Sequence, residues 1–81
     1  MTIRLLFFSV LQDITGTGET TWSLPAGATV ADLLQSLYTQ WPALGEWDSS
    51  LLTAVDQTYV KRSEILHENC EVAIMPPVQG G

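Results

Sequence analysis

The residues with the clearest chemical potential are the last six of the sequence, Pro76 to Gly81, which read PPVQGG. Proline fixes φ and lacks an N–H, so a strand cannot extend its ladder past Pro76 and the chain should leave the domain as an extended stub. Four further residues reach roughly 13 Å at ~3.3 Å per residue. Because Gly80 and Gly81 lack Cβ atoms, their backbone can enter a very narrow slot. The pattern indicates that the α-carboxylate of Gly81 is the reactive group; the alternative is an inert, frayed terminus.

Two other reactive side chains, His67 and Cys70, are the only histidine and the only cysteine of the chain. A metal site needs more strong ligands than this pair supplies. A cysteine nucleophile would also need an orienting group and an oxyanion hole. We therefore interpret them as a turn histidine and an ordinary cysteine at a strand edge. The nearest pair of carboxylates, Glu46 and Asp48, falls in an expected loop and is interpreted as solvated surface.

A continuous apolar stripe predicts one main helix ahead of Pro42. Its members recur at helical spacing, which is typical of a helix that buries one face. Thr29 is the expected N-cap, and Asp32 lies where it favours the exposed N–H groups of the first turn. Pro42 disfavours helical geometry in the preceding residue and ends the helix there. The stripe consists of Val30, Leu33, Leu34, Leu37, Tyr38 and Trp41.

Short strands are predicted around this helix, at residues 3–10, 19–24, 51–55, 58–60 and 71–75. Asp56 and Gln57 should form a tight turn, and Asn69 should adopt left-handed geometry. Residues 11–14 and 63–66 are expected to form single turns and residues 43–50 a loop. The order favours an α+β fold of the ubiquitin-like β-grasp type, a mixed sheet on one helix. The domain is expected to span residues 1–75, and residues 76–81 to form a protruding tail.

Strand alternation assigns the apolar side chains to two faces of the expected sheet. If one set faces the helix, then Phe8, Tyr59 and Met75 share the opposite face, beside the tail exit. An exposed apolar cluster of this kind marks a protein interface. The alternative is that the loop at residues 43–50 folds over it with Trp47. The helix-facing set is Ile3, Leu5, Phe7, Val60, Val72 and Ile74.

Composition limits the class of protein. The 81 residues suffice for one domain, and a single cysteine fits a reducing cytoplasm. The longest apolar runs are far shorter than the ~20 residues of a membrane span, so no membrane association is expected. A formal net charge of −6 argues against direct binding of nucleic acid. The acidic excess could instead steer the chain toward a basic protein surface.

The C-terminal sequence EVAIMPPVQGG, residues 71–81, resembles the end of the molybdopterin synthase small subunits, the MoaD-type sulfur carriers. Residues 51–60 are similar to the central hairpin of that family and residues 5–8 to its first strand, so the resemblance covers essentially the whole chain. Two departures from the family pattern stand out. Asp56 stands where asparagine is usual, and Asn69-Cys70 where Gly-Asp is usual. Both replacements suit turns and leave the tail unchanged.

The resemblance implies that an ATP-dependent, E1-like activating enzyme (MoeB-type) adenylates Gly81, which is then converted to a thiocarboxylate. A sulfurtransferase or cysteine desulfurase would supply the sulfur. A large catalytic subunit (MoaE-type) would receive the tail, and the sulfur would pass to cyclic pyranopterin monophosphate. The family suggests an assembly of two small and two large subunits. The chain itself would bind no cofactor and would be a carrier, with the catalytic groups on its partner.

In this interpretation Gly81 carries the sulfur and Gly80 gives access to the slot. The partner-binding residues would be Phe8, Tyr59, Met75, Pro76, Pro77 and Val78. Three alternatives share the fold: a sulfur carrier for thiamine synthesis or tRNA thiolation, a ubiquitin-like protein modifier, and a plain interaction domain. The usual lack of Pro-Pro in the thiamine and tRNA carriers makes them less favoured.

Overall fold

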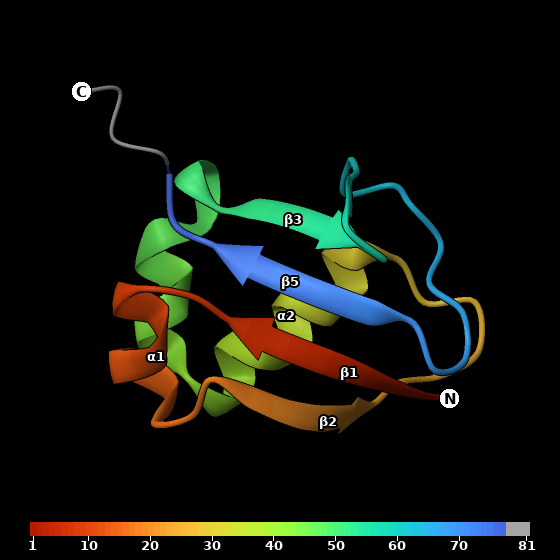
Figure 1. Ribbon diagram of the computed structural model, residues 1–81, viewed down its shortest axis with the longest axis horizontal. Helices are drawn as coiled ribbons and strands as arrows, with labels where there is room; N and C mark the ends of the chain where they lie inside the picture. The colour runs from red at the N-terminus through yellow and green to blue at the C-terminus, as the bar shows by residue number, and fades with distance from the viewer. Residues whose placement is uncertain (78–81) are drawn as a thin grey trace.

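The computed structural model describes residues 1–77, which form one mixed sheet of five strands with the main helix across one face (Figure 1). The strand order is β2-β1-β5-β3-β4, with β1 and β5 parallel and the other pairs antiparallel. The first and last strands therefore lie side by side at the centre, which is the predicted β-grasp arrangement. The elements are β1 (Thr2–Phe7), α1 (Val10–Thr15), β2 (Glu19–Ser23), α2 (Val30–Gln40), η1 (Pro42–Ser50), β3 (Leu52–Val55), β4 (Thr58–Tyr59) and β5 (Glu71–Met75).

Helix α2 forms as its sequence predicts. Thr29 Oγ1 accepts a hydrogen bond from Asp32 N at 3.2 Å, and Asp32 Oδ2 accepts one from Thr29 N at 3.0 Å, which makes a capping box. Such reciprocal bonds satisfy donors that a helix start leaves free. The helix ends at Gln40, with Trp41 as C-cap ahead of Pro42. Its stripe is buried at Val30, Leu33, Leu34 and Leu37.

The first strand is shorter than predicted. It ends at Phe7 because Ser9 adopts a φ of 58°, which an extended strand cannot continue. Gln12 N then bonds to Ser9 O at 3.0 Å, and α1 begins at Val10. Leu11 is fully buried while Val10 is 37% exposed, so burial of Leu11 outweighs strand alternation here. The expected turn at residues 11–14 is confirmed within the slightly longer α1, and Gly16 ends that helix with a φ of 78°.

Residues 43–50 are not the irregular loop that their composition predicts, because η1, a 3-10 helix, occupies residues 42–50. Leu44 is fully buried, and Trp47 packs against the same core. Tyr38 Oη donates a hydrogen bond of 2.5 Å to Asp48 Oδ1, and Arg62 Nη1 donates one of 2.8 Å to the same oxygen. These contacts come from other elements, so the local sequence does not reveal them.

The turn predictions succeed where a left-handed residue is required. Asp56 has a φ of 49°, Gln57 a φ of 70° and Asn69 a φ of 64°. Two successive left-handed residues are the geometry of a tight hairpin turn. The turn expected at 63–66 is wrong in position, since Glu64 N bonds to Lys61 O and closes a turn two residues earlier.

No helix in the described part of the chain is long and apolar enough to cross a membrane.

Candidate functional site

The two faces of the sheet differ as the strand alternation predicts. Figure 1 shows the sheet with α2 behind it, so the face toward the viewer is left open. The residues predicted to face the helix are fully buried at Ile3, Leu5, Phe7, Val72 and Ile74, while Val60 packs partly buried against them. Trp47 packs against this core as well, so η1 does not fold over the open face. The alternative in which residues 43–50 cover that face is therefore wrong.

The open face carries a hollow built by the register of four strands. Leu6 lies opposite Ala73, Ala73 opposite Ala54, and Ala54 opposite Tyr59. Residues that lie opposite each other point to the same face. Two small side chains therefore form the floor, with Leu6 rising on one side and Tyr59 on the other. The hollow has a volume of about 300 Å³ and is lined by Leu6, Phe8, Ala54, Gln57, Tyr59, Glu71, Ala73 and Met75. We call it the open-face groove.

The apolar end of this groove lies at the tail exit. Met75 is opposite Leu52, and Phe8 N bonds to Ile74 O at 3.2 Å, which keeps Phe8 in line with β1. Since β1 and β5 are parallel, their C-terminal ends lie side by side, on the left of Figure 1. Phe8 is 42% exposed and Tyr59 is 67% exposed. Phe8, Tyr59 and Met75 all line the groove, so the prediction that they share the open face is confirmed. Large apolar side chains seldom gather on the exposed surface of an isolated domain, and such a cluster is typical of a protein interface.

The tail leaves directly from this end. Pro76 and Pro77 follow Met75 outside β5, and both are half-buried. The remaining predicted site residues, Val78, Gly80 and Gly81, lie outside the described residues.

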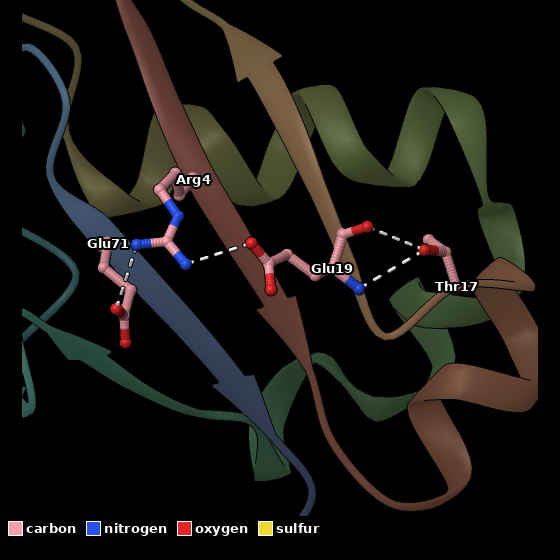
Figure 2. A network of polar contacts seen from close by, with 4 residues as sticks. All are labelled: Arg4, Thr17, Glu19 and Glu71. Atoms are coloured by element: carbon pink, nitrogen blue, oxygen red, sulfur yellow. Dashed lines mark hydrogen bonds and ion pairs between the residues drawn. The ribbon is translucent and has the colours of Figure 1, made fainter.

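The opposite end of the groove is charged. Figure 2 shows Arg4 between two carboxylates, with Nη2 3.0 Å from Glu19 Oε2 and Nη1 3.7 Å from Glu71 Oε2. The hydrogen bond to Glu19 and the charges of both carboxylates raise the pKa of Arg4. Thr17 fixes the start of β2, since its Oγ1 donates to Glu19 O at 2.8 Å and accepts from Glu19 N at 3.3 Å. Asp56 Oδ1 accepts a hydrogen bond of 3.0 Å from Glu71 N, which places a further carboxylate beside this end.

The side chains considered for internal chemistry do not form a site. Cys70 is 2% exposed and belongs to the core rather than to an accessible strand edge. His67 Nε2 lies 3.4 Å from Asp56 Oδ2 on the surface. Within residues 1–77 no cluster of three or more histidine, cysteine or carboxylate side chains could hold a metal ion.

Asp48 is not simply the solvated surface carboxylate that its sequence position predicts, because Tyr38 and Arg62 both donate hydrogen bonds to it. The hydrogen bond from Tyr38, followed by that from Arg62, lowers the pKa of the Asp48 carboxyl. Burial and the bond to Asp48 raise the pKa of Tyr38. The guanidinium of Arg62 also donates to the backbone oxygen of Asp48, so this contact fastens η1 to the segment before β5.

Sequence reasoning found only half of the groove floor. Alternation along residues 71–75 predicts Ala73 on the same face as Met75, and the structure confirms this. Ala54 could not be placed beside it, because that requires the register between β3 and β5.

The fold and the open face together define a ubiquitin-like β-grasp domain with an uncovered apolar groove. A profile described as the ThiS family matches residues 5–81, and this match includes the Gly-Gly end. The molybdopterin synthase sulfur carrier subunit of Escherichia coli is 39% identical over 98% of this chain and 99% of that relative. The same subunit of Chlamydomonas reinhardtii is 36% identical over 100% of both chains. The chain belongs to the ThiS family, among the molybdopterin synthase sulfur carrier subunits.

Solved structures agree with this placement. A Pyrococcus furiosus protein assigned as molybdopterin converting factor subunit 1 superposes with a TM-score of 0.87 at 26% identity, over 95% of this chain and 98% of that chain. Two further structures, with 100% of both chains covered, show the fold alone. They are the small archaeal modifier SAMP1 of Haloferax volcanii (TM-score 0.85, 24% identity) and a complex of subunits 1 and 2 of the Helicobacter pylori molybdopterin-converting factor (TM-score 0.71, 17% identity).

Proposed function

We propose that this chain carries sulfur on the carboxylate of Gly81 and delivers it, in the cytoplasm, to the large subunit of molybdopterin synthase. The observation that supports the proposal most is the position of the groove. An exposed apolar surface ends where the chain leaves β5, so a partner that covers Phe8 and Met75 also receives the tail. The family match also supports the proposal, because it extends through residue 81 and so includes the Gly-Gly end.

The proposed chemistry begins with activation of the tail. A free carboxylate is a poor acyl donor, because its leaving group would be an oxide. Adenylation by an E1-like enzyme uses ATP, releases pyrophosphate and joins AMP to Gly81 as a good leaving group. A persulfide on a sulfurtransferase or cysteine desulfurase would then attack with its outer sulfur and displace AMP, which gives an acyl disulfide between Gly81 and that enzyme. A second thiol cleaves the S–S bond, so Gly81 keeps the outer sulfur as a thiocarboxylate and the two thiols form a disulfide. The thiocarboxylate sulfur is then a nucleophile at the C-terminus of the carrier.

The residues of this chain position the tail rather than catalyse the transfer. Pro76 and Pro77 restrict the backbone after β5, so the tail starts in a defined direction. Gly80 and Gly81 bring no side chains, which suits a narrow tunnel in the partner. Transfer to cyclic pyranopterin monophosphate would use acid–base groups of the large subunit. No cofactor bound to this chain is required.

The proposed partner is a large subunit that covers the open-face groove, with two copies of each subunit in the assembly. The Helicobacter pylori structure, a complex of subunits 1 and 2, contains a chain of this fold together with its second subunit. An exposed patch lined by Phe8, Tyr59 and Met75 is the kind of surface that such a contact would bury.

A second candidate is a protein modifier joined through Gly81 to lysine side chains, because SAMP1 shares the fold over the whole chain. The mass of the protein isolated from cells that contain the activating enzyme separates the two functions. Replacement of one carboxylate oxygen by sulfur supports the carrier, whereas a protein-sized adduct supports the modifier. An unmodified mass under conditions that load a known carrier would contradict both.

Tail variants provide the functional test. Removal of Gly81, or Gly80→Leu, should abolish sulfur transfer in an assay with the large subunit and the pterin substrate. Because a glycine has no side chain to add to a core, the midpoint of thermal unfolding should stay close to that of the original protein. Retained transfer would overturn the proposal, and a large fall in the melting temperature would mean that the tail is structural.

A further inference from the structure

The floor of the open-face groove is its most specific feature. The exposed face of a sheet usually presents polar side chains to water. Here Ala54 and Ala73 lie side by side across β3 and β5, between the larger Leu6 and Tyr59. Ala54 is only 6% exposed although it lies on the open face, because the walls of the groove shield it. The surface is therefore a hollow and not a flat apolar patch.

The size of the hollow limits what it can accept. Its volume is about 300 Å³. An enclosed apolar cavity of ~150 Å³ accepts a benzene molecule. An open hollow twice that size has room for one large aliphatic or aromatic side chain together with part of its backbone. A partner surface with only small side chains would leave the alanine floor uncovered and lose those dispersion contacts.

The charged end supplies the second constraint on the partner. The carboxylates of Glu19, Glu71 and Asp56 border this end. Arg4 pairs with the first two, and the imidazole of His67 lies 3.4 Å from Asp56. The ion pair between Arg4 and Glu71 is the looser of the two that Arg4 makes, at 3.7 Å against 3.0 Å. Three carboxylates thus face one permanent cation, and the surface beside the groove is acidic. Charge complementarity calls for a cation on the partner here.

We propose that the open-face groove is a socket for one large apolar side chain of the large subunit, and that a lysine or arginine beside this side chain pairs with Glu71. This inference rests on the proposed function, since it names the chemistry of the partner that the tail must reach. The apolar contact holds the tail exit against the partner. The cation sets the orientation along β5, because a partner turned end for end would place its charge against Phe8 and Met75.

Methyl spectroscopy tests the socket in the unaltered protein. The carrier is labelled at alanine methyl groups and titrated with the unlabelled large subunit of the same organism. The Ala54 and Ala73 methyls should shift and gain contacts with an aliphatic or aromatic side chain of the partner. Ala31, exposed on α2, should not. A complex in which both floor methyls remain unshifted would overturn the socket.

Substitutions test the same point by affinity. Ala73→Leu fills the hollow and should weaken binding about tenfold or more, as loss of a packed interface contact does. Ala31→Leu adds the same side chain on the exposed face of α2 and should leave binding unchanged. Glu71→Gln should slow association at low salt and reduce its salt dependence, since charges at the rim act mainly on the association rate. Glu46→Gln, exposed in η1, is the matched charge control.

The outcomes separate this inference from the proposed function. If the original protein binds the large subunit and forms molybdopterin, while Ala73→Leu and Glu71→Gln bind like their controls, the socket is wrong and the carrier function stands. If the original protein neither binds nor supports product formation, both proposals fail. A free carrier that dimerises through the groove, seen by sedimentation and abolished by Ala73→Leu, would also overturn the assignment of the groove to the large subunit.

Discussion

Met75→Asp is the substitution that most directly tests which face of the sheet meets the partner. Met75 lies opposite Leu52, lines the open-face groove and immediately precedes Pro76. In the free protein the new carboxylate can remain hydrated, because Met75 is only half-buried. In the complex the same carboxylate would be stripped of water without a partner to pair with it.

The magnitudes should differ between the monomer and the complex. Full burial of a methionine side chain contributes about 1.5–3 kcal/mol, and a half-buried one contributes correspondingly less. We therefore expect the free energy of unfolding to fall by about 1 kcal/mol. An interface anchor replaced in this way costs about 2 kcal/mol or more of binding free energy. That loss corresponds to roughly a thirtyfold increase in Kd.

Titration calorimetry with the large subunit, together with a denaturant melt of the free carrier, separates the two effects. Phe8→Asp should behave like Met75→Asp, because Phe8 lines the same end of the groove. Glu46→Ala, exposed in η1, should change neither quantity. If Met75→Asp unfolds the monomer while the folded fraction binds with unchanged affinity, Met75 belongs to the core and the assignment of faces is inverted.

Three further predictions concern residues that do not line the groove. Cys70→Ser puts a hydroxyl in the core, so it should lower the free energy of unfolding by about 1–3 kcal/mol in a urea melt. Both Cys70→Ser and His67→Ala should still transfer sulfur. A Cys70→Ser protein that folds but is inactive would mean that Gly81 is not the sulfur carrier. The folded-state pKa of Asp48 lies below its ordinary value of 3.8, so its contribution to stability is complete above pH 3.8 and is lost as the pH falls through that lower pKa. In urea melts over that pH range, the free energy of unfolding of Asp48→Asn should fall less than that of the original protein. Equal falls in the two proteins would contradict the reasoning. Thr29→Ala should cost about 1 kcal/mol through loss of the cap, measured by the same melts, and no change would mean that the capping box adds nothing.

The sequence by itself determined the features that depend on neighbours along the chain. Thr29 and Asp32 are three residues apart and cap α2 by bonds between themselves, so the start of that helix is determined locally. The left-handed turn at Asp56 and Gln57 and the division of β1 and β5 into two faces follow equally from short-range sterics. The PPVQGG ending also needs no fold to be recognised.

The tertiary structure decided what depends on residues far apart in the chain. The apolar run after Phe7 is compatible with a longer strand, and only the burial of Leu11 turns it into α1. Asp48 lies in a segment of loop composition that becomes η1 through side chains of α2 and of the stretch before β5. The groove itself exists because the register of β5 against β3 places Ala73 beside Ala54. Alternation along one strand specifies a face but not the residue opposite, since register is set by pairing across the sheet.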